Sequence, residues 1–220
     1  MCDVPTEYRR SLLNHLGHQL TLLYFLWCSN IDPIAELLPC TQLDNLIFKD
    51  SSFIPRPSLH HCVSDADNHQ FLPNLEKLTT SSTCLGDWSS LFECPRPLLT
   101  HLILSCSHIG IESKSPLFDW HNIPEMWPNL QYLAILNTLN LTLDKLKGIL
   151  ILLNKLKEAH LPSKIFNQFV DEQIGIEEIG QQIVDIMCFI KNANPDNVLG
   201  MLAFRFFPNE HCPFIPETDP

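Results

Sequence analysis

The chain has 220 residues, a length that predicts a single domain. Hydrophobic residues make up 45% of the sequence and charged residues 18%, a balance that allows a buried core and excludes global disorder. The net charge at pH 7 is −11. So acidic a surface repels phosphate backbones and anionic lipids, which argues against a nucleic-acid or membrane partner.

Nine cysteines are scattered along the chain without a C-x-x-C pair. An odd number of scattered cysteines is typical of free thiols in a reducing compartment. The first ten residues are polar and do not form a signal-peptide pattern, and the longest apolar stretches are too short to span a bilayer. We therefore expect a cytoplasmic or nuclear protein.

Leucine accounts for 36 of the 220 residues and recurs in a fixed pattern. Apolar residues occupy positions 1, 4 and 6 of the pattern, and a small polar or thiol residue occupies position 9, as in Leu20, Leu23, Phe25 and Cys28. Positions 4 and 6 alternate as in a strand and are predicted to face a shared core, while position 9 turns the chain and hydrogen-bonds to backbone. One copy cannot bury its apolar side alone, so the copies must stack. The copies, of which the last two are weaker, begin at Leu20, Leu43, Leu75, Leu99, Leu130, Leu156 and Leu199.

This pattern predicts parallel strands near residues 22–26, 45–49, 77–81, 101–105, 132–136, 158–162 and 201–205. Apolar residues at helical spacing predict helices over 7–16, 31–38, 144–158 and 171–192. The last of these helices lies in a predicted helical insertion, 163–198, where isoleucine replaces leucine. Residues 1–208 are predicted to form one α/β domain, followed by a proline-rich tail, 209–220.

The repeats resemble those of the leucine-rich-repeat superfamily. They are most similar to the cysteine-containing, ribonuclease-inhibitor-like type of F-box proteins, because Cys28 occupies the ninth position and the phrases LPNLEKL and WPNLQYL look like repeat starts. Ser, Thr, Lys or Phe stands at the ninth position in the other copies. The resemblance implies a curved, irregular α/β solenoid with a parallel sheet on its concave face and helices and loops on its convex face.

No motif of an enzyme is present. His60, His61, Cys62 and His69 lie together, but adjacent histidines do not have the spacing of a structural zinc site. Phosphate-binding glycine loops and a nucleophile motif are also missing from the sequence. We therefore expect no catalytic residue, no metal and no cofactor; a hydrolase that uses Cys and His is the least favoured alternative.

The outward residues of the predicted strands are the best candidates for a binding surface. Aromatic and basic groups gather there, in contrast to the acidic average of the chain, and such groups are favoured anchors in protein interfaces. The alternative is that they are ordinary exposed residues, with Trp27 covered by an N-terminal cap. The candidate partner-binding residues are Tyr24, Trp27, Lys49, Asp50, Lys77, His101, Tyr132, His160 and Arg205.

The expected function is non-enzymatic recognition of another protein, whose identity the sequence does not reveal. The resemblance implies a more specific role, the substrate-binding part of an F-box-type ubiquitin ligase receptor. No F-box is visible ahead of the repeats, so a ligase adaptor would bind only if an F-box exists outside this chain. The alternative is a ribonuclease-inhibitor-like regulator whose concave face blocks an enzyme.

Overall fold

A computed structural model describes residues 4–49, 51, 71–81, 95–105, 123–137, 142–162 and 176–205. The loop that contains His60, His61, Cys62 and His69 lies outside the described residues, as does the predicted tail.

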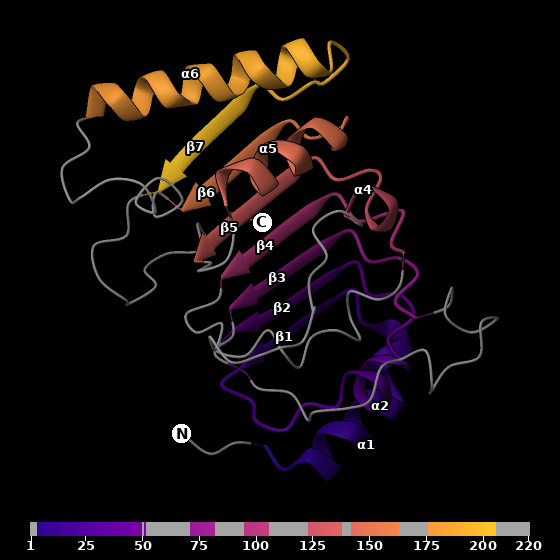
Figure 1. Cartoon of the computed structure of the whole chain (residues 1–220). Coiled ribbons are helices and arrows are strands. Elements are labelled where there is room, and N and C mark those ends of the chain that lie inside the picture. The colour runs from indigo at the N-terminus through magenta and orange to yellow at the C-terminus, as the bar shows by residue number, and fades with distance from the viewer. Residues whose placement is uncertain are drawn as a thin grey trace.

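The described residues form an α/β fold with one open parallel sheet of seven strands. Each strand pairs with the next along the chain, so the order in the sheet is the order in the sequence (Figure 1). The strand positions agree with those predicted from the repeat, and one strand is a residue longer. The strands are β1 (Leu22–Leu26), β2 (Asn45–Lys49), β3 (Lys77–Ser81), β4 (His101–Ser105), β5 (Tyr132–Asn137), β6 (Glu158–Pro162) and β7 (Met201–Arg205).

The second residues of the strands lie in one continuous row. Leu46, Leu78, Leu102 and Leu133 occupy successive rungs and are at most 1% exposed, which confirms the predicted register. Leu23 extends the row at one end. We call the side of the sheet on which this row lies the core face, and the side reached by the first, third and fifth residues of each strand the outer face.

The fourth residues form a second row on the core face. Phe25 and Phe48 stack in this row with ring centroids 5.0 Å apart and an interplanar angle of 7°. Thr80 lies next to Phe48 and is fully buried, yet its hydroxyl has no hydrogen-bond partner among the residues that the structure describes. Further along this row, Leu104 of β4 lies opposite Ile135 of β5. A bulge directly after this pair places Ser105 opposite Asn137, which accounts for the additional residue of β5.

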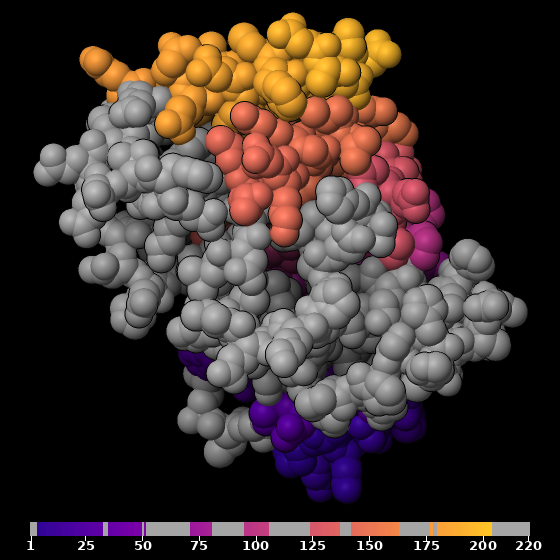
Figure 2. Space-filling view, in the orientation of Figure 1, coloured from indigo at the N-terminus to yellow at the C-terminus, as the bar shows by residue number. Residues whose placement is uncertain are grey.

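The helices pack their apolar sides into the same core as the sheet. They are α1 (Thr6–Leu16), the 3-10 helix η1 (Gly17–Gln19), α2 (Pro33–Leu37), α4 (Ile123–Met126), α5 (Leu143–Leu152) and α6 (Ile176–Ala193). Figure 1 and Figure 2 show α1 and α2 at the β1 end of the array and α6 at the β7 end, where α6 packs against α5. The two ends of the array therefore carry different helices.

One predicted helix is too long. The apolar stripe predicts a helix over 144–158, but α5 begins after its N-cap Thr142 and ends at Leu152. Leu156 instead donates its N–H to the Leu153 carbonyl in a turn, at 3.1 Å, and Glu158 already begins β6. The helical spacing continues past the true end of the helix because Leu156 is the first residue of the next repeat. Within the predicted insertion, α6 lies at 176–193, and residues 163–175 are not described.

The turns before the strands repeat the same contacts. In the first six copies the first leucine donates its N–H to the carbonyl three residues earlier, as Leu75 does to Leu72 at 3.2 Å, whereas Leu199 donates to the side chain of Asn197. The asparagine of each Pro-Asn-Leu phrase donates to a carbonyl of the preceding turn: Asn74 to Thr41 at 2.9 Å and Asn129 to Pro97 at 2.6 Å. These side-chain hydrogen bonds connect neighbouring copies. They also supply donors to carbonyls of the turns, which are not paired within a strand or a helix.

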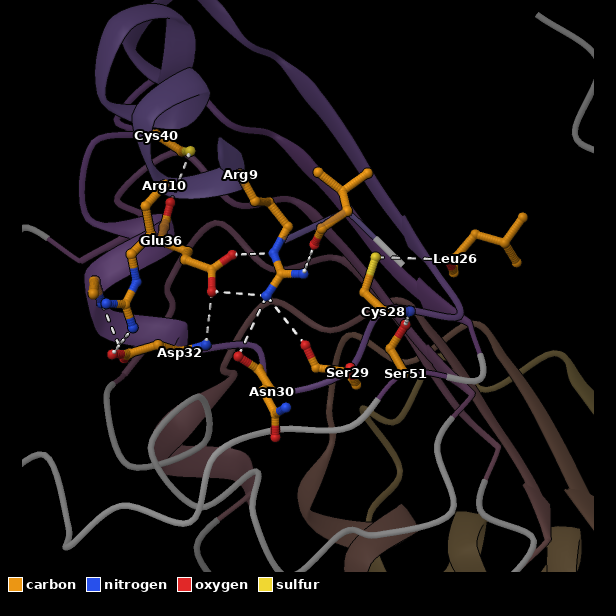
Figure 3. A network of polar contacts seen from close by, with 12 residues as sticks. Arg9, Arg10, Leu26, Cys28, Ser29, Asn30, Asp32, Glu36, Cys40 and Ser51 are labelled. Atoms are coloured by element: carbon orange, nitrogen blue, oxygen red, sulfur yellow. Dashed lines mark hydrogen bonds and ion pairs between the residues drawn. The ribbon is translucent and has the colours of Figure 1, made fainter. Parts of the chain in front are cut away.

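A buried ion pair fixes the N-terminal end of the array (Figure 3). The Arg9 guanidinium, on α1, donates through Nε and Nη2 to the two carboxylate oxygens of Glu36, on α2. Glu36 is fully buried and Arg9 is 7% exposed. Arg9 Nη2 also donates to the carbonyls of Ser29 and Asn30, at 3.2 and 3.3 Å. Asn30 has a positive φ of 53°, which is uncommon for a residue other than glycine. The side chain of Arg9 therefore holds α1, α2 and this unusual turn together.

A second pair completes this network. Arg10 Nη2 donates to Asp32 Oδ2 at 2.9 Å, and Asp32 Oδ1 accepts the N–H of Ala35 at 3.2 Å at the start of α2. The Asp32 backbone N–H donates to Glu36 Oε1 at 3.0 Å.

At the end of β1, the Cys28 N–H donates to the hydroxyl of Ser51 at 3.1 Å. Ser51 is the ninth residue of its copy, so it makes the backbone contact that the repeat predicts for that position.

Candidate functional site

The outer face carries a row of polar and aromatic side chains across four neighbouring strands. Lys77, His101, Tyr132 and Glu158 are the first residues of β3 to β6, and each lies in register with the next. The strands place them there because the leucine that follows each of the first three points into the core. We call these four residues together with His160 the outer-face cluster.

Three rings of the outer-face cluster form a continuous stack. The centroids of His101 and Tyr132 are 5.7 Å apart at an interplanar angle of 23°. Those of Tyr132 and His160 are 5.4 Å apart at 38°. Neighbouring strands lie about 4.8 Å apart, so the spacing of the strands brings the rings into contact. The ring edges and their polar atoms are what the stack can present to a partner.

The two histidines have different surroundings. His160 is 7% exposed and its Nε2 contacts Glu158 Oε1. His101 is half-buried, and its Nδ1 lies 2.8 Å from the hydroxyl of Thr100. That hydroxyl also donates to the Glu76 carbonyl at 3.2 Å, and because it has one hydrogen, both contacts are satisfied by the tautomer that carries the proton on Nδ1.

Burial lowers the pKa of His101 below its ordinary value of 6.5, and the positive charge of Lys77 lowers this pKa further. The carboxylates of Glu158 and Glu76 act in the opposite direction without cancelling the shift. His101 is therefore neutral at pH 7, and the outer-face cluster carries one basic and one acidic side chain at its two ends.

The other predicted residues are not part of this cluster. Tyr24 lies on the outer face of β1 and is 48% exposed. Trp27 follows β1 with a positive φ of 50° and is 49% exposed, so the alternative that an N-terminal cap covers it is wrong. Lys49 ends β2 and is half-buried. Asp50 lies outside the described residues, and of Arg205 only the backbone, at the end of β7, is described.

The sequence interpretation differs from the structure at two residues of the cluster. His160 is predicted to be accessible, but at 7% exposure it supports Tyr132 and contacts Glu158 rather than offering its ring to solvent. Glu158 is missing from the predicted set, although its side chain is 35% exposed. The same register that places Tyr132 on the outer face also places Glu158 there, but a criterion of aromatic and basic groups does not include a carboxylate.

Of the three cysteines that the structure describes, Cys40 is buried and Cys188 is exposed. Burial raises the pKa of the Cys40 thiol to about 11, so this thiol is protonated at neutral pH and donates to the Glu36 carbonyl at 3.7 Å. Across the described ranges, no three His, Cys, Asp or Glu side chains gather into a group that could hold a metal ion. None of the described helices is long and apolar enough to cross a membrane.

Comparison with known proteins gives no relative: no protein family, no curated protein and no solved structure matches this chain.

Proposed function

We propose that this chain is a leucine-rich-repeat scaffold that binds another protein without catalysing a reaction, with the outer face as the concave binding surface. The parallel sheet in sequence order, the continuous leucine row and the repeated turns support a stacked-repeat architecture. The described helices pack into the core with the leucine rows, so among the described residues the outer face is formed by the side chains of the strands.

The observation that carries the proposal is the outer-face cluster itself. On a face without function, strand residues need only be polar enough to keep the chain soluble. Here a lysine, a histidine, a tyrosine and a glutamate follow one another in register on four adjacent strands. The rings are held by mutual stacking, so they are already ordered before a partner binds and lose little side-chain entropy on binding. Tyrosine is also among the residues that contribute most to protein interfaces.

The test compares two double variants in capture from native cells followed by measurement of affinity. Lys77→Ala with Tyr132→Ala removes the exposed charge and the central ring of the cluster. Lys145→Ala with Tyr8→Ala removes the same residue types from exposed positions on α5 and α1. We expect the first pair to weaken binding at least tenfold, about 1.4 kcal/mol, and the second to leave it unchanged. Equal binding by both double variants would refute the assignment of the outer face.

The same capture addresses the specific role. Substrate recognition for an F-box-type ubiquitin ligase, as the resemblance implies, requires that the ligase adaptor and cullin be captured with the chain. A partner without these subunits whose affinity falls steeply with ionic strength would instead favour the enzyme regulator, because the net charge of −11 suits a basic enzyme.

A further inference from the structure

The free edge of β1 presents unpaired backbone groups. The Thr21 carbonyl accepts the N–H of Asn45, and the Trp27 N–H donates to the Lys49 carbonyl, so these two residues direct their backbone toward β2. Backbone N–H and C=O groups point to opposite sides of a strand at successive residues. The N–H and C=O groups of the intervening even-numbered residues therefore point away from β2. Those residues are Leu22, Tyr24 and Leu26.

Within the described part of the chain, the only hydrogen bond to these outward groups is the contact of Cys28 Sγ with the Leu26 carbonyl, at 3.6 Å. β1 is the first strand of the sheet, and among the described strands it pairs with β2 alone. An edge of this kind is a template for pairing with a further strand.

The side chains of the same three residues are exposed. Leu22 is 54%, Tyr24 48% and Leu26 39% exposed on the outer face. Residues 20–30 contain no charged residue, no proline and no glycine, although the chain as a whole has a charge of −11. Natural edge strands are usually protected by charges, prolines, bulges or a covering helix or loop. β1 has no charge, proline or bulge, and although α1 and α2 lie at this end of the array, no described residue of either helix hydrogen-bonds to its outward backbone groups.

We propose that β1 pairs with β1 of a second copy of this chain, as antiparallel strands related by a two-fold axis at Tyr24. In this register Tyr24 lies opposite Tyr24 of the second copy, and Leu22 lies opposite its Leu26. All three are then hydrogen-bonded pairs, since every outward N–H and C=O of one strand meets its counterpart in the other. The result is a symmetric dimer in which the two sheets are continuous.

The second copy fits this edge better than other occupants for two reasons. An uncharged apolar strand without proline or glycine has the composition of segments that pair with identical copies of themselves, whereas a charged partner segment would find no opposite charge in residues 20–30. Pairing β1 of one copy with β7 of another would build a ring or a filament of several copies, but the two-fold arrangement closes at two copies. This dimer does not depend on the outer-face cluster, which lies on β3 to β6.

The first test measures the mass of the full chain in solution by sedimentation or light scattering. We expect twice the chain mass of 25.2 kDa at micromolar concentration. Tyr24→Lys places two positive charges opposite each other at the axis and should weaken dimerisation at least tenfold. Met201→Lys introduces the same charge at a 45% exposed position on β7 and should leave the dimer unchanged. A monomeric wild-type chain, a dimer that survives Tyr24→Lys, or longer assemblies that Met201→Lys dissolves would each overturn the proposal.

Two further measurements test the register and do not depend on one variant. Tyr24→Glu should also be monomeric, and an equimolar mixture of the Tyr24→Lys and Tyr24→Glu chains should recover the dimer, since the opposite charges then meet at the axis. In the wild-type chain, hydrogen exchange of residues 22–26 should slow as the protein concentration rises. Failure of the mixture to dimerise, or exchange that is independent of concentration, would contradict the pairing.

Discussion

Replacing Arg9 by methionine tests whether the buried ion pair holds the N-terminal end of the array. Methionine keeps most of the volume of the side chain but leaves the fully buried Glu36 carboxylate with the Asp32 N–H as its remaining described hydrogen bond. The carbonyls of Ser29 and Asn30 lose a donor as well. Removing one partner of a buried pair costs about 3–5 kcal/mol, a large share of a total stability that is about 5–15 kcal/mol in most domains.

The assay is urea unfolding followed by circular dichroism. With a urea dependence of about 2 kcal/mol per molar, a loss of about 4 kcal/mol lowers the midpoint by about 2 M. The matched control is Arg10→Met, because Arg10 has a side chain that is 38% exposed and makes one ion pair, with Asp32. Because Asp32 is fully buried as well, we expect this control to destabilise the chain, but by less than Arg9→Met, since Arg9 also binds the carbonyls of Ser29 and Asn30.

A third variant separates the charge from the packing. Combining Arg9→Met with Glu36→Gln removes the unpaired buried charge, so the double variant should be more stable than Arg9→Met alone. The reasoning fails if Arg9→Met and Arg10→Met shift the midpoint equally, or if the double variant is less stable than the single one.

Three further predictions follow from the core and the outer-face cluster. Leu102→Asp puts an unpaired charge into the shared leucine row and should cost at least about 3 kcal/mol, whereas Leu98→Asp, at a 46% exposed position, should melt like the wild-type chain; equal melting of the two would contradict the register. Thr80→Val removes a buried hydroxyl without a partner among the described residues and should raise the free energy of unfolding by about 1 kcal/mol, which a lower urea midpoint would disprove. Because the pKa of His101 is lowered below 6.5 in the folded chain, the unfolded chain binds this proton more readily, and the free energy of unfolding should fall as the pH drops through 6.5. His101→Gln should reduce this fall, and identical pH profiles of the wild-type and variant chains would show that the shift is absent.

The strands could be predicted from the sequence because two local rules coincide at each copy. Alternation with period two directs Leu102 and Leu104 inward, and the turn at the first leucine of the copy fixes where the strand begins. The end of α5 could not be predicted in this way. The spacing of Leu146 and Leu156 suits a helix, and only the turn that Leu156 makes with Leu153 shows that the helix has already ended.

The candidate site could be predicted in part. The sequence indicates that Lys77, His101 and Tyr132 face outward, because each precedes an inward leucine. Their stacking depends on neighbours 24 to 31 residues away in the chain, whose alignment comes from the register of the sheet. The burial of His160 likewise depends on Tyr132 beside it, which a single repeat does not reveal.

The spacing of the strands and the choice of residues that enter the core follow from the sequence alone, since they depend on local alternation and on the need of apolar side chains to leave water. The tertiary structure decided which charges are buried and which edge is open. Arg9 and Glu36 read as ordinary surface residues until α1 and α2 are brought together. Residues 22–26 follow the same pattern as the strands inside the sheet, and only their place at its end leaves one side of β1 without a neighbouring strand among those described.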